Sequence, residues 1–346
     1  MKAVIAKTTG AWNEVLELTE IPDIREIPDE ALHVRVHACG MGFPDLLQVE
    51  GKYQLEAKPP FVPAGYVTGE IIGLGSAVDG SRFKIGDRVA GNAIPDLQGH
   101  MAGGLAEEAL LYPDMAVHVP DWMDDAVVLA MHDNYWDVHN GLVTCGRVGP
   151  DDTLLVLGAS GACGMAAVDL GKAHGAHVVA CASNPEKLEA CLRAGADRVL
   201  DYGEEADYDR FIATLKEAEL YGKINLVFDP VGGGYGEAAF RAMARAGRYV
   251  LFGFASGGTD PKSAFPDFPI NLLLMRGQQL LGSMDSSRGE KVDEMFEMVK
   301  EGRLHPGSGA RGDDSRHYTL DNFLEAFRAI ATRKAIGKVV VDIKPS

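Results

Sequence analysis

A glycine-rich stretch in the middle of the chain restricts its fold more than any other feature. Four apolar residues at 154–157 run directly into Gly158-Ala159-Ser160-Gly161-Ala162-Cys163-Gly164, and a segment of helical character follows. Phosphate-binding loops require this order of strand, glycine turn and helix. The missing Lys-Ser/Thr pair argues against a P-loop. The stretch therefore predicts a dinucleotide site, against the simpler interpretation of a tight turn without a ligand.

Each part of this loop has a predicted task. Gly161 lets a pyrophosphate approach the backbone, and Gly164 lets the helix pack tightly on the strand. The N-terminus of the helix offers free N–H groups to the anion. We therefore assign the cofactor to these loop residues: Gly158, Ser160, Gly161, Ala162, Cys163 and Gly164.

The chain after position 150 alternates between apolar strands and helices. The predicted strands are 153–157, 177–181, 198–200, 224–228, 248–252 and 279–283. The predicted helices between them are 161–174, 185–194, 208–219 and 235–244. Strands this apolar favour a parallel sheet that helices cover on both faces.

The first part of the chain has a different pattern. Residues 32–38 alternate apolar and polar, and residues 59–91 form short apolar runs between Gly and Pro. Short strands with frequent turns predict a small β-barrel. Residues 124–140 predict a helix.

The C-terminal tail holds a predicted helix at 320–332 and a predicted strand at 338–343, and is too short to fold alone. We therefore expect an α/β chain of two domains. The predicted segments are a first domain at 1–126, a second at 127–285, and a return to the first at 286–346.

Charge and cysteine content exclude several classes of function. The formal net charge of -17 opposes binding to nucleic acid and to anionic membranes. The N-terminus lacks the apolar core of a signal peptide, and no segment approaches the ~20 apolar residues of a membrane span. Five cysteines without a Cys-x-x-Cys pair argue against a full disulfide framework. We expect a cytoplasmic protein without nucleic-acid or membrane partners.

The end of the second parallel strand selects the nucleotide. An NAD site usually places Asp or Glu on the ribose diol, about 20 residues past the glycines. Here the strand ends at Ser183-Asn184, and the first acid is Glu186. The Ser183 hydroxyl and the Lys187 ammonium suit a 2′-phosphate, although most helix lysines are simply solvated. The sequence therefore favours NADPH.

These motifs together resemble the medium-chain dehydrogenase/reductases, in particular the zinc-free quinone oxidoreductase (zeta-crystallin-like) branch. The resemblance covers nearly the whole chain. Beside the glycine loop, it rests on 36–45, 51–53, 63–69, 86–89, 194–202, 228–233, 247–250 and 337–341. It implies a GroES-like β-barrel domain, a Rossmann doubly wound parallel sheet, and a homodimer. It also implies NADPH contacts at Ser183, Lys187, Tyr202 and Arg333, with Gly253 and Phe254 beside the nicotinamide.

Two departures from the zinc enzymes of this superfamily predict that no metal is bound. Those enzymes place Cys-His where this chain has Gly42-Phe43, and His-Glu where it has Gly65-Tyr66. Neither pair here ligates zinc. Without a strong Lewis acid, hydride transfer favours an acceptor that spreads the charge, such as a quinone or an α,β-unsaturated carbonyl.

Tyr53 is the predicted catalytic residue. It stands in the Gly-x-Tyr loop where related enoyl-thioester reductases carry a catalytic tyrosine, and a phenol donates a proton to a carbonyl oxygen or an enolate. The alternative is an aromatic wall residue. Tyr66 is either a second donor or a space-filling residue, and we favour the latter.

Further departures fall on the substrate side. Gly42 replaces a usual Asn, residues 133–136 replace small residues and a threonine, and Met284 replaces a usual Trp. The predicted substrate-binding residues are Gly42, Phe43, Tyr66, Asn134, Trp136 and Met284. They suit a small apolar electrophile. Two alternatives stay open: an enoyl-thioester (acrylyl-CoA-type) reductase, and a catalytically silent NADPH-binding structural or sensor protein.

Overall fold

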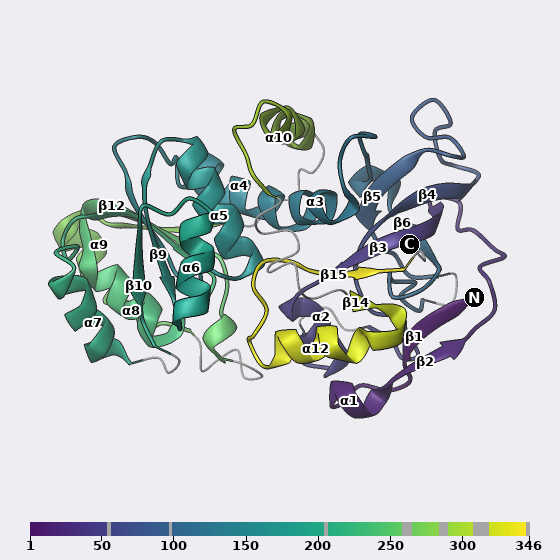
Figure 1. Ribbon diagram of the computed structural model, residues 1–346, viewed down its shortest axis with the longest axis horizontal. Coiled ribbons are helices and arrows are strands. Elements are labelled where there is room, and N and C mark those ends of the chain that lie inside the picture. The colour runs from purple at the N-terminus through teal and green to yellow at the C-terminus, as the bar shows by residue number, and fades with distance from the viewer. Residues whose placement is uncertain are drawn as a thin grey trace. The chain divides into compact units, whose positions relative to one another are not determined.

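The structure is a computed structural model that describes residues 1–53, 57–96, 99–203, 207–257, 265–283, 290–306 and 318–343. The chain divides into two compact units. The first contains residues 1–133, 287–294 and 310–346, and the second contains 134–286 and 295–309. Figure 1 shows both units, with elements labelled where there is room.

This division differs from the predicted segments in two places. The first unit extends to Asp133, beyond position 126, and the second keeps residues 295–309, which were predicted to return to the first. Two contacts give the reason. Asp133 pairs with Lys338 of the first unit, and the His305 N–H donates to the Asp169 carboxylate of the second unit at 2.7 Å.

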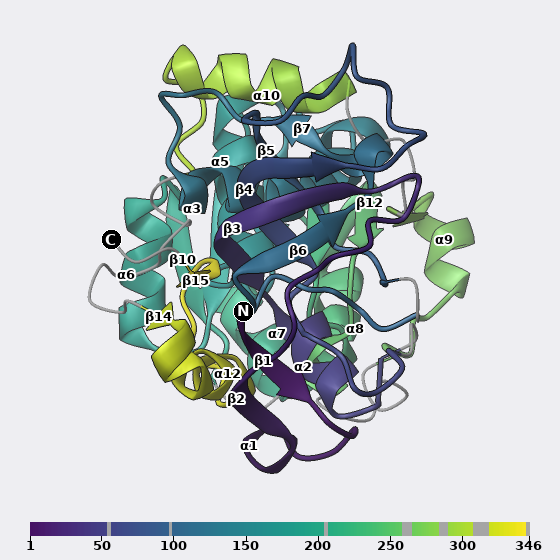
Figure 2. The same ribbon diagram turned by 90° about the vertical axis from the view of Figure 1, so that its right-hand side faces the viewer.

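The first unit is built mainly from antiparallel strands. They are β1 (Lys2–Ala6), β2 (Leu16–Glu20), β3 (Leu32–Met41), β4 (Tyr66–Leu74), β5 (Arg88–Asn92), β6 (Glu108–Leu111), β7 (Val117–His118), β14 (Tyr318–Thr319) and β15 (Val339–Asp342). Among the described residues β1 pairs with β2, and the larger sheet has the order β14-β15-β3-β4-β5-β7, with β6 also on β3 (Figure 2). This is the predicted GroES-like sheet.

The first unit also contains helices. They are α1 (Trp12–Val15), α2 (Phe43–Val49), α3 (Asp125–Ala130) and α12 (Phe323–Ala331), with 3₁₀ turns at Pro113–Met115 and Leu320–Asn322. Helix α10 (Glu290–Lys300) contains residues of both units. Helix α12 buries Phe323, Phe327 and Ile330 in the same core as Leu32 and Val34 of β3.

The C-terminal strand completes the first unit. Strand β15 pairs antiparallel with β3, from Val339 opposite Met41 to Asp342 opposite Ala38. The strand expected at 338–343 is present as Val339–Asp342. The sheet therefore places the last described strand beside residues that are about 300 positions away in sequence.

The second unit contains a parallel sheet. Its strands are β8 (Thr153–Val156), β9 (His177–Ala182), β10 (Arg198–Asp201), β11 (Ile224–Asp229), β12 (Met243–Leu251) and β13 (Gln279–Gly282), in the order β10-β9-β8-β11-β12-β13. Its helices are α4 (Trp136–His139), α5 (Ala162–Ala173), α6 (Pro185–Arg193), α7 (Tyr208–Glu217), α8 (Gly233–Ala242) and α9 (Asn271–Arg276), with a 3₁₀ turn at Ala255–Gly257. The predicted Rossmann sheet is confirmed.

Apolar strand residues explain why helices cover this sheet. Leu155, Val179 and Val227 point from three neighbouring strands into one core, which they share with Phe211 of α7 and Phe240 of α8. Burying each such side chain contributes roughly 1.5–3 kcal/mol. Strands β9, β8 and β11 are therefore covered by helices because they have no polar face to leave in water.

The predicted helix at 124–140 is longer and less regular than expected. The helical run extends from Asp125 to Cys145, and Asp124 caps it by accepting from the Ala126 N–H at 2.8 Å. Two π-helical turns, Met131–Tyr135 and Asn140–Cys145, flank α4. Each π turn widens the helix locally and changes the direction of its side chains, and such turns are frequent at functional sites.

No helix in the described ranges has both the length and the apolar character that a bilayer crossing requires.

Candidate cofactor and substrate site

The glycine loop joins β8 to α5 and is held by the neighbouring strands. The Leu157 N–H donates to the Phe228 carbonyl at 3.0 Å, and the Ala159 N–H donates to the Cys181 carbonyl at 2.9 Å. A Cβ on Gly164 would lie 2.3 Å from the Gly158 oxygen. Only glycine at this position lets α5 come so close to the loop.

Gly161 has no comparable constraint from the protein. Its φ is -77°, and a Cβ there would lie 3.5 Å from the Gly158 oxygen, an ordinary contact. The residue directly precedes the first turn of α5, whose N–H groups have no acceptors within the helix. The loop backbone and the positive end of the helix dipole therefore suit a pyrophosphate at Gly161. Ser160 is buried in the same loop.

The turn after β9 brings together the two residues predicted for a 2′-phosphate. Asn184 caps α6, because its side-chain oxygen accepts from the Lys187 N–H at 3.0 Å. The Lys187 Nζ donates to the Ser183 Oγ at 3.3 Å. Both side chains are half-buried. The ammonium and the hydroxyl are two hydrogen-bond donors that lie close together, and such a pair suits a phosphate dianion.

Tyr202 and Arg333 have different surroundings. Tyr202 is 9% exposed, and its ring stacks on Tyr235 with centroids 4.3 Å apart. Burial raises the pKa of the Tyr202 phenol. Little of this ring is open to an adenosine. Arg333 lies in the first unit, on the exposed turn after α12, with a φ of 55°.

Asp229 organises the loop at the end of β11. Its fully buried carboxylate accepts from the Val231 N–H at 2.7 Å and from the Gly232 N–H at 2.8 Å, and the Tyr249 hydroxyl also donates to it. Burial raises the pKa of Asp229. Sequence reasoning missed this role, although an acid directly before Pro-Val-Gly-Gly at a strand end was a usable signal.

The same loop supports the segment predicted to pass the nicotinamide. The Gly253 N–H donates to the Asp229 carbonyl at 3.1 Å, and the Ser256 N–H donates to the Val231 carbonyl at 2.8 Å. Phe254 packs against Phe265 with centroids 4.6 Å apart. Residues 253–256 are therefore fixed on the β11 side of the glycine loop, where β11 adjoins β8.

The π-helical turn Met131–Tyr135 carries Asn134 to the glycine loop. The Asn134 Nδ2 donates to the Cys163 Sγ at 3.4 Å. Among the described residues, neither the Asn134 Oδ1 nor the Trp136 Nε1 has a hydrogen-bond partner, and both are buried. The Tyr135 hydroxyl anchors the turn by donating to the Asp169 Oδ2 at 2.6 Å. Met284 lies outside the described residues.

Asp45 connects two loops of the first unit. The buried carboxylate accepts from the Gly42 N–H at 2.7 Å and from the Gly65 N–H at 3.2 Å. Burial raises the pKa of Asp45, and the nearby Lys338 ammonium opposes this shift. The loops that begin at Gly42 and Gly65 are thus held by one carboxylate, a role that sequence reasoning missed.

Lys338 forms a second buried contact in this unit. Its ammonium pairs with Asp133 and lies 5.3 Å from the centre of the Tyr66 ring. A Cβ on Gly40 would lie 2.6 Å from the Lys338 Cε, so glycine makes room for the lysine chain. The Tyr66 ring also meets the His132 ring edge to face, with centroids 6.1 Å apart. Sequence reasoning missed the Asp133–Lys338 pair.

Tyr53 and Phe43 stand at the two ends of α2. Phe43 opens the helix and is partly buried against the first unit's core. Tyr53 follows the turn that ends it, where the Lys52 N–H donates to the Leu47 carbonyl at 2.8 Å and Gly51 has a φ of 70°. The Tyr53 ring is half-buried. The backbone at Tyr53 is thus placed by the turn that follows α2.

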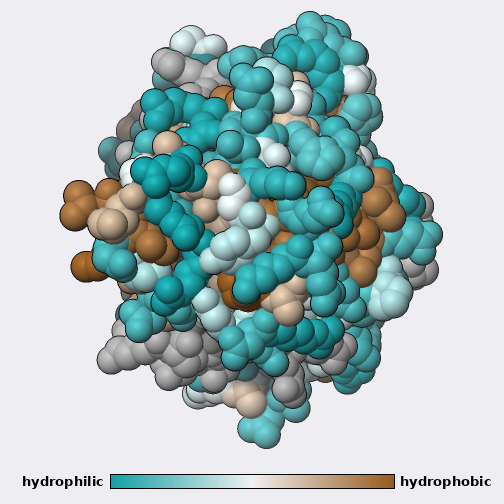
Figure 3. Space-filling view, turned by 90° about the vertical axis from the view of Figure 1, so that its left-hand side faces the viewer, coloured by the Kyte–Doolittle hydropathy of each residue, from teal (hydrophilic) through white to brown (hydrophobic). Residues whose placement is uncertain are grey.

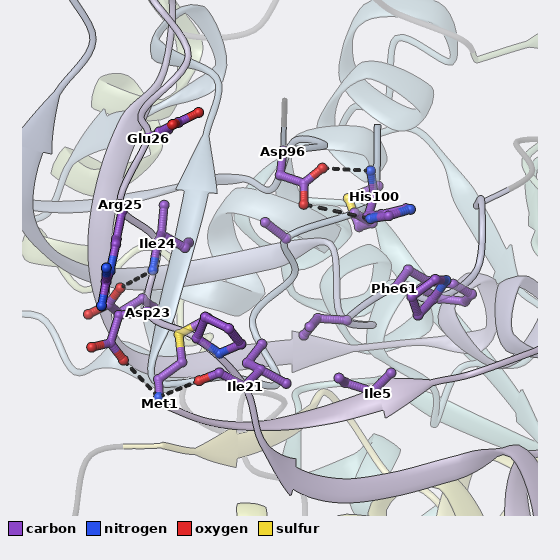
Figure 4. A pocket seen from close by; sticks show the side chains of 16 residues that line it. Met1, Ile5, Ile21, Asp23, Ile24, Arg25, Glu26, Phe61, Asp96 and His100 are labelled. Carbon is purple, nitrogen blue, oxygen red and sulfur yellow. Dashed lines mark hydrogen bonds and ion pairs between the residues drawn. The ribbon is translucent and has the colours of Figure 1, made fainter. Parts of the chain in front are cut away.

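A separate cavity of about 490 Å³ lies elsewhere in the first unit (Figure 4). Ile5, Ile24, Phe61 and Met101 contribute to its apolar lining, and the Asp96–His100 pair lies at one side. None of the predicted cofactor or substrate residues lines it. This cavity is therefore not the predicted site.

The structure also locates the possible metal ligands and thiols. In the ranges that the structure describes, no three or more His, Cys, Asp and Glu side chains are grouped to hold a metal ion. All five cysteines are described, and all are free thiols.

Comparisons with known proteins match both units. A family model described as zinc-binding dehydrogenase matches residues 162–301, and one described as alcohol dehydrogenase GroES-like domain matches residues 28–121. A quinone oxidoreductase-like protein 2 homolog of Nematostella vectensis is 32% identical, with 90% of this chain and 82% of that protein covered. Prostaglandin reductase-3 of Bos taurus is 26% identical, with 100% and 90% covered. A mycobacterial structure complexed with NADPH has a TM-score of 0.81 at 25% identity, with 99% of both chains covered.

Proposed function

We propose that this chain, which belongs to the zinc-free quinone oxidoreductase branch of the medium-chain dehydrogenase/reductase superfamily, reduces a quinone or an α,β-unsaturated carbonyl with NADPH. The chain is an oxidoreductase. The observation that carries the proposal is the glycine loop, where Gly161 has no internal reason to be glycine but does suit a pyrophosphate. The names of the relatives, quinone oxidoreductase-like protein and prostaglandin reductase, support the acceptor class.

The chain's own residues divide the work of this reaction. The first turn of α5 binds the pyrophosphate, and Ser183 with Lys187 binds the 2′-phosphate. The Asp229 loop fixes Gly253 and Phe254 for contact with the nicotinamide. When bound, NADPH supplies the hydride. Tyr53 donates a proton to the acceptor oxygen or the enolate.

Metal independence is part of the proposal. At the positions of the zinc ligands, Gly42, Phe43, Gly65 and Tyr66 offer no coordinating nitrogen, thiolate or carboxylate. The Asp45 carboxylate, which is near both loops, is already occupied by two backbone N–H groups. Elemental analysis of the purified protein is expected to find far less than one zinc per chain, and stoichiometric zinc would refute this part.

A turnover panel tests the proposed function. The purified protein and NADPH are offered quinones, enones and enoyl-CoA thioesters, and NADPH loss is followed by absorbance. We expect turnover with quinones or enones and little with the thioesters. Turnover confined to enoyl-CoA substrates would establish the thioester reductase instead. Tight NADPH binding with no turnover of any acceptor would support a sensor or structural role.

Lys187→Ala is expected to weaken NADPH binding by about 10–100-fold and to leave NADH nearly unchanged, because a hydrogen bond to a charged group contributes about 1.5–3 kcal/mol. Dissociation constants from calorimetry check this. The control is Lys172→Ala, which removes a lysine that pairs with Asp197 at 2.7 Å and should affect neither cofactor. If Lys187→Ala weakened the binding of NADPH and NADH equally, Lys187 would not be a ligand of the 2′-phosphate.

A homodimer is the proposed assembly. Strand β13 is an edge of the parallel sheet, and an open strand edge is a pairing surface. The adjoining α9 exposes 86% of Leu274 and 65% of Met275. Hydrophobic residues, drawn in brown, protrude at the left edge of the space-filling view (Figure 3). Sedimentation equilibrium is expected to give about twice the chain mass of 37.0 kDa. A monomer would contradict the proposal.

The five free thiols support a reducing cytoplasm as the compartment.

A further inference from the structure

The side-chain amide of Asn134 is only half satisfied. The side chain is 7% exposed, and its Nδ2 donates to the Cys163 Sγ at 3.4 Å. Its Oδ1 is buried and has no hydrogen-bond partner in the part of the chain that the structure describes. A buried acceptor without a donor costs about 1–3 kcal/mol, and such groups are usually satisfied by water or a ligand.

Asn140, the other buried asparagine of the same helical run, provides a comparison. It is also buried, and its Nδ2 donates to the Ser283 carbonyl at 2.7 Å. That amide links the helical run to the end of β13. The Asn140 amide therefore has a hydrogen-bond partner within the protein and needs no ligand.

The position of Asn134 selects one half of the dinucleotide. Cys163 belongs to the first turn of α5, where the pyrophosphate is expected. Ser183 and Lys187 follow β9, on one side of β8, whereas β11 and β12 lie on the other side. The helical run lies on the second side, because a Cβ on its Gly141 would meet Val250 of β12 at 3.3 Å. If the adenosine half lies at Lys187, the nicotinamide half lies on the side of Asn134.

We propose that the Asn134 Oδ1 accepts a hydrogen bond from the carboxamide N–H of the nicotinamide. This inference rests on the proposed function and adds a residue that recognises the nicotinamide carboxamide. The carboxamide is the N–H donor on that half of the cofactor. Holding it fixes the rotation of the ring and thus the face that meets the acceptor. The π-helical turn at Met131–Tyr135 directs Asn134 to this place.

The proposal is tested by comparing two proteins, wild type and an Asn134 variant, each with two ligands, NADP and an analogue that lacks the carboxamide N–H. In the 3-acetylpyridine analogue of NADP, a methyl ketone replaces the carboxamide, so the carbonyl stays and the N–H is lost. Calorimetry with NADP and this analogue gives binding constants without any turnover. Wild-type protein is expected to bind NADP about tenfold more tightly than the analogue, the value of one hydrogen bond. Asn134→Leu, which keeps the side-chain shape, is expected to bind both equally.

Two further variants separate this role from a structural one. Asn140→Leu removes the amide that bonds to Ser283 and should keep the tenfold preference, even if its melting temperature falls. Asn134→Asp keeps an acceptor, so it should keep the preference while binding both ligands more weakly beside the pyrophosphate. Asn134→Ala replaces the leucine variant if that one does not fold.

The outcomes are distinct. An unchanged tenfold preference in Asn134→Leu would overturn the proposal. Equal weakening of both ligands would also overturn it, and would assign the Oδ1 to a ribose hydroxyl. If wild-type protein bound neither NADP nor NADPH, the proposed function itself would fail, independently of Asn134.

Discussion

Replacing Lys338 with methionine is expected to lower the free energy of unfolding of the first unit by about 3–5 kcal/mol. The lysine side chain is 1% exposed, and its ammonium pairs with the Asp133 carboxylate. Removing the cation leaves a carboxylate in the interior without its partner, and that carboxylate lies at the π-helical turn Met131–Tyr135. Urea titration followed by circular dichroism measures the change.

A double variant tests whether the loss comes from the unpaired charge. Lys338→Met combined with Asp133→Asn should recover a large part of the stability, because neither member of the pair is then charged. Lys7→Met is the surface control. It breaks the Lys7–Glu17 pair, whose side chains are both more than half exposed, and should change stability by less than about 1 kcal/mol. A loss below about 1 kcal/mol in Lys338→Met would show that the pair does not support the fold.

Tyr53→Phe is expected to lower kcat by about 10²-fold or more, with a change in KM of only a few-fold, because positioned proton donors typically contribute 10²–10⁴-fold to a rate. The substitution keeps the ring at the end of the turn after α2 and removes only the hydroxyl. Steady-state kinetics with the best acceptor of the turnover panel measures both constants.

Tyr66→Phe is the matched control for this experiment. The Tyr66 ring contacts the Lys338 ammonium and His132, contacts that phenylalanine keeps. We expect kcat to stay within a few-fold of the wild-type value. The reverse result, with Tyr66→Phe slow and Tyr53→Phe unaffected, would make Tyr66 the proton donor and Tyr53 a wall residue.

Short-range features of the site were predictable from the sequence. The glycine loop is contiguous, and strand, turn and helix follow each other without interruption, so its backbone geometry depends on neighbours in sequence. Ser183 and Lys187 are also close in sequence, since Ser183 directly precedes the Asn184 cap and Lys187 lies in the first turn of α6. Their contact at 3.3 Å therefore depends on local chain geometry at the capped start of the helix.

Long-range contacts of the site were not predictable in this way. Asp133 and Lys338 are 205 positions apart and meet because β15 pairs with β3 in a particular register. A shift of one residue would turn Lys338 to the other face of the sheet. The two N–H groups on Asp45 belong to Gly42, 3 positions away, and to Gly65, 20 positions away. Nothing in the spacing of these residues indicates the shared carboxylate.

The helix at 125–145 shows the same division within one element. The residue pattern at 124–140 predicted a helix, since such a pattern acts through neighbouring residues. The two π-helical turns were not predicted, and they decide that Asn134 meets Cys163 while Asn140 meets Ser283. By itself, the sequence determined the family, the two sheets and the strand–turn–helix order of the glycine loop, because local pattern and backbone geometry specify them. Only the tertiary structure decided which buried polar groups are paired and which are not, because that depends on register and helix rotation between distant segments.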